Sequence, residues 1–167
     1  NELITHDPLT GLHNRQFMQD MLERERARLA RGGITYCVAM IDLDHFKLVN
    51  DRHGHPVGDV VLVELASLIR GNVRASDIAC RYGGEEFTLV LPADVTTGGA
   101  FLADRVVRAV RALSIPHLGR PDGISRITVS VGYAGTGETR EMKPLIAQAD
   151  RALYEAKRAG RNLARAG

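Results

Sequence analysis

A pair of adjacent glycines near the middle of the chain, Gly83 and Gly84, restricts the fold more than any other feature. Apolar residues alternate with other residues on both sides of the pair, over residues 78–82 and again over residues 87–91. This alternation is typical of β-strands, and glycine tolerates the positive φ angles of tight hairpin turns. We therefore predict an antiparallel hairpin here, which disfavours an open α/β sheet, the nearest alternative fold.

Apolar spacing in the rest of the chain predicts the elements around this hairpin. We expect helices over residues 15–31, 57–72, 102–113 and 144–159, strands over residues 35–43 and 127–132, and a polar connection over residues 44–55. After the first helix the order is strand, helix, strand, strand, helix, strand, followed by a terminal helix. This is the ferredoxin-like βαββαβ pattern. We expect an α+β fold whose antiparallel central sheet carries helices on one side, with added helices at both ends.

Composition limits what the chain can bind and where it works. Of its 167 residues 44% are hydrophobic, enough for the core of a single domain over residues 1–167. The net charge of +2, with dispersed basic residues, predicts no nucleic-acid partner. Cys37 and Cys80 lie in apolar runs outside any CxxC pair, so we expect buried thiols in a reducing, cytoplasmic compartment.

No segment is long and apolar enough for a membrane helix, so we expect no membrane contact from the domain itself. The chain starts at Asn1 without a methionine. We therefore expect a domain excised from a longer sensor protein, and an anchor of that parent in the membrane is compatible with this expectation.

Asp42 is the least expected residue, because it follows an apolar run that predicts a central strand buried on both faces. An unpaired carboxylate in such a place would cost several kcal/mol, so it requires a cation. The alternative is an ordinary aspartate at the end of a strand, which caps the turn that follows.

Glu85 and Glu86 follow the glycine pair directly. In a βαββαβ sheet the first strand and the hairpin are neighbours at the centre, so both glutamates are expected to converge with Asp42. Carboxylates that share a site repel one another unless a metal holds them, and oxygen-only ligands favour Mg²⁺ or Mn²⁺. Mg²⁺ held by few carboxylates usually also binds substrate phosphates, which predicts two-metal phosphoryl transfer. An exposed polar turn is the alternative for the two glutamates.

Several spaced blocks, found from end to end of the chain, resemble the GGDEF family in a GGEEF form. They are DPLTGLHNR at residues 7–15, IDLDHFK at 41–47, ND at 50–51, GH at 54–55, GD at 58–59, RYGGEEF at 81–87, TVSVG at 128–132 and ADRALYEAK at 149–157. The family has diguanylate cyclase activity, and its fold resembles the nucleotidyl cyclase and polymerase palm domain. The resemblance implies that the chain condenses two GTP molecules into cyclic di-GMP and two pyrophosphates.

The resemblance also implies roles for residues of the active site. Two Mg²⁺ or Mn²⁺ ions are expected per site, bound by the carboxylates of Asp42, Glu85 and Glu86 and by the carbonyl of Leu43, with Glu85 helping to activate the 3′-hydroxyl. The residues expected to bind GTP are Asn50 and Asp59 at the guanine edge, Phe46 and Lys47 beside the triphosphate, Gly83 and Gly84 in the turn, and Lys157 and Arg161 at the β and γ phosphates. A carboxylate suits guanine, because it accepts from N1–H and from the exocyclic amine.

A second, product-binding site is implied upstream of the hairpin. Residues 74–77, RASD, resemble the RxxD motif of the family, with Arg74 and Asp77 as ligands of cyclic di-GMP. Arg105 falls where a second arginine of this inhibitory site is expected. The alternative for RxxD is a salt bridge at a helix end.

One domain holds only one GTP, so the implied reaction requires a homodimer in which each 3′-hydroxyl attacks the α-phosphate of the other nucleotide. The main alternative is an inactive domain that binds GTP or cyclic di-GMP and signals by contact, which the intact Asp42, Glu85 and Glu86 disfavour. Asp59 disfavours a mixed guanine–adenine product. A polymerase palm is disfavoured because the chain has no room for fingers or a thumb.

Overall fold

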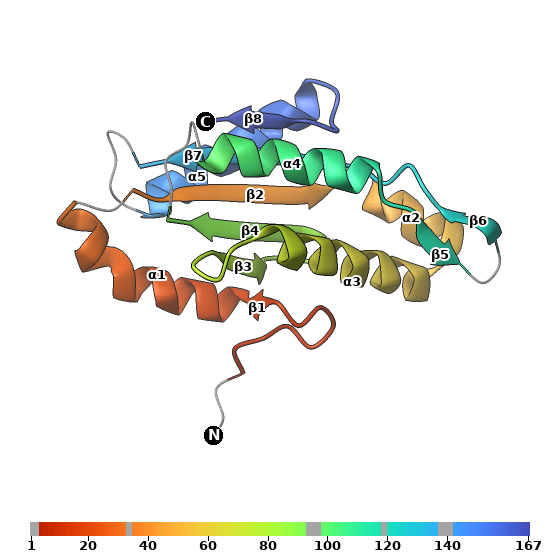
Figure 1. Cartoon of the computed structure of the whole chain (residues 1–167), viewed down its shortest axis with the longest axis horizontal. Coiled ribbons are helices and arrows are strands. Elements are labelled where there is room, and N and C mark those ends of the chain that lie inside the picture. Colours follow the sequence, from red (N-terminus) through yellow and green to blue (C-terminus); the bar gives the residue numbers. More distant parts are fainter. Residues whose placement is uncertain (1–3, 33–34, 93–97, 118–119, 137–141) are drawn as a thin grey trace.

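The structure is a computed structural model that describes residues 4–32, 35–92, 98–117, 120–136 and 142–167 (Figure 1). Its helices are α1 (Arg15–Ala30), α2 (Phe46–His53), α3 (His55–Asn72), α4 (Ala100–Arg111) and α5 (Met142–Arg158). Its strands are β1 (His13–Asn14), β2 (Cys37–Leu43), β3 (Ile78–Arg81), β4 (Glu86–Leu91), β5 (Ile115–His117), β6 (Arg120–Ile124), β7 (Val129–Gly135) and β8 (Ala164–Ala166).

One six-stranded sheet organises the domain, with its strands in the order β1-β3-β4-β2-β7-β8. The inner strands β3, β4, β2 and β7 are antiparallel neighbours and form the ferredoxin-like core. At the edges β1 pairs with β3, and β8 with β7, in parallel. The βαββαβ order and the antiparallel central sheet are therefore confirmed. The central strand β2 is buried along its whole length, as predicted.

Helices cover both faces of the sheet, so the expectation of helices on one side is wrong. On one face α3 and α4 pack against Ile41 of β2, and on the other α1 and α5 pack against Val38 and Met40. Figure 1 shows α3 and α4 in front of the sheet and α5 behind it. The reason lies in β2, whose successive side chains point to opposite faces, so that an apolar strand has to be covered twice. The helices at the two ends of the chain supply the second cover.

The elements that the sequence pattern missed are short or exposed. α2 occupies most of the stretch predicted as a polar connection, and it has no buried residue, so no apolar face at helical spacing reveals it. The strands β1, β5 and β8 have two or three residues each, too few for a period to be recognised. None of the helices in the described ranges is long and apolar enough to cross a membrane.

Both cysteines are buried thiols, as the sequence predicts. Cys37 belongs to the cluster under α3 and α4, and Cys80 to the cluster under α1 and α5. Burial raises the pKa of the Cys80 thiol to about 12, so this group is protonated at neutral pH. The cysteines therefore serve as core residues.

Candidate active site

Two acidic side chains, and the main chain of a third acidic residue, lie where β2 ends beside the glycine turn. Asp42 and Glu86 are register partners on β2 and β4, so their side chains lie on the same face of the sheet. Glu85 precedes Glu86, and its carbonyl accepts a hydrogen bond from the N–H of Leu43 at 3.2 Å. Asp42 is buried, with only 6% of its surface exposed. The strand register thus brings Asp42 and Glu86 together at the centre of the sheet, and Glu85 adjoins them through its main chain.

Asp42 is only half satisfied by the protein. Its Oδ2 forms an ion pair with Nζ of Lys157, near the C-terminal end of α5. Its Oδ1 is buried and has no hydrogen-bond partner among the residues that the structure describes. Burial raises the pKa of Asp42, and the bond to Lys157 opposes this rise. One carboxylate oxygen therefore remains open to a further positive group.

Glu86 places a second carboxylate beside Asp42 and so increases the negative charge at this site. Burial raises the pKa of this carboxyl, and the negative charges of Asp42 and Glu85 raise it further. Within the described part of the chain, no three His, Cys, Asp or Glu side chains are grouped as in a ready-made metal site. The donors are nevertheless all oxygen, and the open Asp42 Oδ1 offers a position to a hard cation. The residues therefore fit a divalent cation that takes its other ligands from water or from a bound phosphate.

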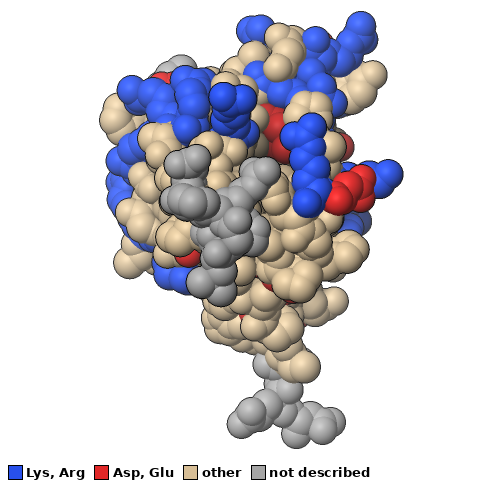
Figure 2. Space-filling model, turned by 90° about the vertical axis from the view of Figure 1, so that its right-hand side faces the viewer, with Lys and Arg blue, Asp and Glu red and all other residues tan. Residues whose placement is uncertain are grey.

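Two cations come to this site from the end of α5. Lys157 lies in the last turn of the helix. Arg161 follows Gly160 outside the helix, and the two residues have φ angles of 65° and 116°, respectively. Burial raises the pKa of Asp42, and the charge of Arg161 opposes this rise. Figure 2 shows Lys and Arg side chains gathered at this end of the molecule, next to acidic ones.

Asp44 is a buried residue that is not among the site residues predicted from the sequence. Its carboxylate accepts hydrogen bonds from Thr128 Oγ1 at 2.7 Å, from Ser130 Oγ at 2.6 Å and from the N–H of Asn162 at 3.0 Å. These partners come from β7, from the segment before it and from the segment after α5. Asp44 therefore ties the end of β2 to the turn that carries Arg161. The only signal in the sequence is its position two residues after Asp42, directly beyond the predicted strand.

The contact between α2 and α3, where Asn50, Gly58 and Asp59 lie, contains an unsatisfied polar atom, and we call this region the niche. The Oδ1 atom of Asn50 on α2 is buried and finds no hydrogen-bond partner among the described residues. A Cβ atom on Gly58 of α3 would lie 1.9 Å from this oxygen and 3.2 Å from Cζ of Phe46. Gly58 is therefore required for the Asn50 side chain to lie where it does. Asp59 follows on α3 and is exposed, as is Lys47 in the first turn of α2.

The glycine turn forms for a reason other than the one predicted. Neither Gly83 nor Gly84 has a positive φ angle, so the expected left-handed conformation is wrong. The connection between β3 and β4 spans residues 82–85 and needs no tight two-residue turn. A Cβ on Gly83 would lie 3.3 Å from Glu86 Oε2, whereas one on Gly84 would meet nothing within 4 Å. The first glycine thus leaves room for a carboxylate, and the second leaves the main chain accessible.

Arg81 holds this turn against the start of the chain. Its guanidinium donates hydrogen bonds to the carbonyl of Gly84 at 2.9 and 3.2 Å and to the carboxylate of Asp7 at 3.2 and 3.3 Å. Asp7 also accepts from the N–H and the hydroxyl of Thr10, at 2.8 and 2.7 Å. The DPLT block and the GGEEF block, which are far apart in the sequence, are therefore in direct contact.

Arg74, Asp77 and Arg105 line a separate cavity of about 200 Å³. Asp77 Oδ2 accepts from the N–H of Arg74 at 2.7 Å, so the acid closes the turn of the RxxD segment. Among the described residues Arg74 and Asp77 form no ion pair with each other. Arg105 donates to the carbonyl of Asn72 at 2.6 Å, and its guanidinium lies 5.6 Å from the centre of the Phe101 ring. All three residues of the predicted product site are thus brought together.

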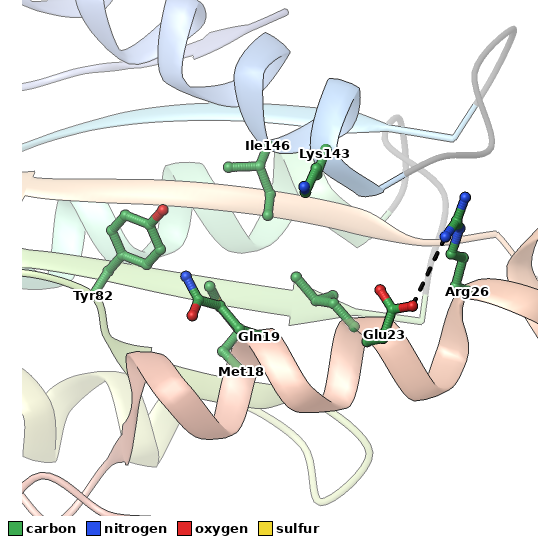
Figure 3. Close-up of a pocket in the computed structure, with 8 residues that line it drawn as sticks. Met18, Gln19, Glu23, Arg26, Tyr82, Lys143 and Ile146 are labelled. Atoms are coloured by element: carbon green, nitrogen blue, oxygen red, sulfur yellow. Dashed lines mark ion pairs between the residues drawn. The ribbon is translucent and has the colours of Figure 1, made fainter.

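A larger cavity of about 580 Å³ lies between α1 and α5 (Figure 3). Met18 of α1 and Ile146 of α5 line opposite sides of it, and Tyr82 of the glycine turn lies at one end. None of the three carboxylates lines this cavity. Cavity size therefore does not point to the carboxylates, where the buried Oδ1 of Asp42 finds no partner among the described residues.

The chain matches known proteins over nearly its full length. Residues 4–163 match the family model described as diguanylate cyclase, GGDEF domain. The chain is 40% identical over 164 residues to the response regulator PleD of Caulobacter vibrioides. The aligned residues cover 96% of this chain and 36% of PleD. It is 41% identical over 156 residues to the diguanylate cyclase DgcP of Pseudomonas aeruginosa, covering 93% of this chain and 23% of DgcP. The chain thus spans about a third or less of the length of these relatives.

Solved structures share its fold throughout. The GGDEF domain of DgcB from Caulobacter crescentus, in complex with c-di-GMP, has a TM-score of 0.92 and 36% identity, covering 99% of this chain and 94% of that one. The diguanylate cyclase SiaD from Pseudomonas aeruginosa, in complex with its activator SiaC, has a TM-score of 0.87 and 40% identity, covering 97% and 61%. The predicted α+β fold is therefore confirmed and is consistent with a palm-like nucleotidyl cyclase.

Proposed function

Since the chain belongs to the GGDEF family of diguanylate cyclase domains, we propose that it condenses two GTP molecules into cyclic di-GMP and two pyrophosphates. The observation that carries this proposal is the open oxygen of Asp42, buried opposite Glu86 and next to the cation Lys157. A buried acceptor without a partner is costly unless a ligand completes it. A nucleotide phosphate with its counter-ion is such a ligand.

Guanine would bind in the niche between α2 and α3. The open Asn50 Oδ1 would accept a hydrogen bond from a guanine N–H, and the exposed carboxylate of Asp59 would accept from N1–H and the exocyclic amine. Adenine has no N1–H donor, and its exocyclic amine is on C6 instead of C2, so it cannot offer these two donors to a carboxylate. The pair would therefore select GTP over ATP.

The triphosphate would extend from this niche toward the cations of α5. The first N–H groups of a helix have no partner within the helix, so Phe46 and Lys47 at the start of α2 present amides to an anion. Lys157 and Arg161 would neutralise the β and γ phosphates. Gly83 and Gly84 would let the nucleotide approach the turn closely.

Two divalent cations, Mg²⁺ or Mn²⁺, would be held in each active site. Their ligands would be the carboxylates of Asp42, Glu85 and Glu86 and the carbonyl of Leu43. Such an ion supplies Lewis acidity and charge neutralisation at the phosphate. Asp42 provides the open oxygen for it, and Lys157 limits the repulsion among the three carboxylates. The metal is thus proposed on the chemistry of the donors.

The reaction would need two copies of the domain face to face, each with one GTP. The 3′-oxygen of each nucleotide forms a bond to the α-phosphorus of the other. The bond between that phosphorus and the oxygen that bridges to the β-phosphate breaks, and pyrophosphate leaves. Glu85, at the mouth of the glycine turn, would accept the proton of the 3′-hydroxyl. Arg74, Asp77 and Arg105 would bind the product in their own cavity and so inhibit the enzyme.

Incubation of the chain with GTP and Mg²⁺ tests this proposal, with products separated and identified by mass. We expect cyclic di-GMP, with a specific activity that rises with protein concentration because two loaded copies must meet. GTP that is bound but unchanged would identify the alternative, an inactive binding domain. A specific activity that stays constant down to monomeric concentrations would contradict the two-copy reaction.

A further inference from the structure

We propose that Arg111, at the end of α4, is a positioning residue that holds Arg161 in place for the phosphates of the nucleotide. This inference rests on the proposed function, because it assumes that Arg161 binds phosphate. Arg111 belongs to none of the sequence blocks that define the family resemblance. It acts through Asn162, the residue that follows Arg161.

The turn after α5 has an unusual backbone. Gly160, Arg161 and Asn162 have φ angles of 116°, 65° and 55°, so three consecutive residues have positive φ. Glycine adopts this conformation freely, whereas residues with a Cβ adopt it at an energetic cost. Such strain persists only where the surrounding contacts over-determine the backbone, and it is concentrated at functional sites. The contacts that hold Asn162 are therefore the ones that hold the direction of Arg161.

Asn162 is held from two sides. On one side its N–H donates to Asp44 Oδ2 at 3.0 Å. On the other, Arg111 Nε donates to the side-chain Oδ1 of Asn162 at 3.2 Å, and an Arg111 Nη donates to its main-chain carbonyl at 3.2 Å. The planar guanidinium thus fixes the side chain and the backbone of one residue at once. Asp44 is itself fixed by Thr128 and Ser130, so the second anchor is rigid.

These contacts place Arg161 in the same frame as the carboxylates. Asp44 lies two residues after Asp42, and it accepts from the N–H of Asn162, the residue after Arg161, at 3.0 Å. Arg161 itself is exposed, and its N–H donates back to the carbonyl of Ala156, at 3.0 Å. Its guanidinium is therefore aimed by the backbone around it. Without the two hydrogen bonds from Arg111, Asn162 would keep its bond to Asp44 but would lose the contacts that fix its side chain and its carbonyl. The backbone of the turn could then change conformation, and the side chain of Arg161 would no longer point toward the phosphates.

The chain offers a matched control on the same helix. Arg108, three residues earlier on α4, is also exposed, and among the residues that the structure describes its ion pair is with Asp104 of the same helix, at 3.2 Å. Arg108→Ala and Arg111→Ala remove the same side chain from neighbouring turns of α4, but only the second touches Asn162. Because exposed pairs of this kind contribute little to stability, both variants should fold with similar melting temperatures.

Binding of 3′-deoxy-GTP, which cannot react, separates positioning from a structural effect. We expect Arg111→Ala to weaken its binding on the order of tenfold, because the phosphate cation is misplaced. Binding of GMP, which lacks the β and γ phosphates, should change little, and Arg108→Ala should match the parent for both. Asn162→Ala should resemble Arg111→Ala, and the double variant should be no worse than either single one.

Amide hydrogen exchange of residues 160–163 without nucleotide supplies a readout that does not depend on the proposed function. Faster exchange in Arg111→Ala than in Arg108→Ala is expected. A parent that binds no 3′-deoxy-GTP would overturn the proposed function, while the exchange result would still decide whether Arg111 holds the turn. A parent that binds, with Arg111→Ala equal to Arg108→Ala in affinity and exchange, would overturn the inference. Equal losses for GMP and 3′-deoxy-GTP would also overturn it.

Discussion

Replacement of Gly58 by alanine separates the stability of the domain from its recognition of guanine. Gly58 lies in α3, directly against the buried amide of Asn50. The added Cβ would lie 1.9 Å from Asn50 Oδ1, 3.0 Å from Asn50 Cγ and 3.2 Å from Phe46 Cζ. Atoms cannot approach so closely, so the amide at the end of the Asn50 side chain has to move. The niche between α2 and α3 would lose its open acceptor.

Two opposing effects decide the stability of this variant. Alanine in place of glycine inside a helix stabilises by roughly 0.5–1 kcal/mol. Overpacking typically costs about 1–3 kcal/mol, and the lower end applies here because a flexible side chain is displaced. The net change in the free energy of unfolding is therefore small. A lost hydrogen bond of about 1–1.5 kcal/mol weakens guanine binding roughly tenfold.

Calorimetry with 3′-deoxy-GTP and thermal melting measure these two effects on the same samples. Gly71→Ala is the matched control, because Gly71 lies on the same helix and its added Cβ would meet nothing within 4 Å. We expect the control to bind as the parent does and to melt slightly higher. Parent-like affinity of Gly58→Ala for 3′-deoxy-GTP would refute the assignment of this niche to guanine.

Three further predictions concern other residues. Asp59→Ser should reduce the preference for GTP over ATP in competition assays, and unchanged discrimination would place the guanine site elsewhere. Arg74→Ala should lose cyclic di-GMP binding and product inhibition in full progress curves while keeping initial turnover, whereas loss of initial turnover would mean that the two sites are not separable. Glu86→Gln should raise stability toward denaturant at neutral pH, because burial raises the pKa of Glu86 and its ionised form destabilises the fold. The difference from the parent should shrink as the pH falls below 4.5, where Glu86 is protonated even in the unfolded chain, and a difference independent of pH would contradict this reasoning.

The convergence of Asp42 with the glutamates could be predicted because local patterns and strand order agree. Alternation around the glycine pair predicts the hairpin, and the βαββαβ order makes that hairpin a neighbour of the strand that ends at Asp42. Asp42, near the end of β2, is then paired with Glu86, the first residue of β4. The two glycines were recognised correctly but explained wrongly, because the turn is longer than a tight hairpin and needs space instead of positive φ.

Contacts between distant segments could not be read from the sequence. Asp44 meets Ser130 and Asn162, and Arg81 meets Asp7, across separations of more than 70 residues. No local period encodes such partners. The helix α2 was missed because it is exposed, and periodicity reveals only helices that have an apolar face.

The central claim is that the carboxylates at the end of β2 and in the glycine turn perform the chemistry, and Glu85→Ala tests it most directly. Product formation from GTP and Mg²⁺ should be measured for parent and variant, with binding of cyclic di-GMP at the Arg74 cavity as a measure of folding. We expect the variant to bind cyclic di-GMP as the parent does and to form no detectable product. A variant that binds cyclic di-GMP normally and still turns over GTP at the parent rate would contradict the account.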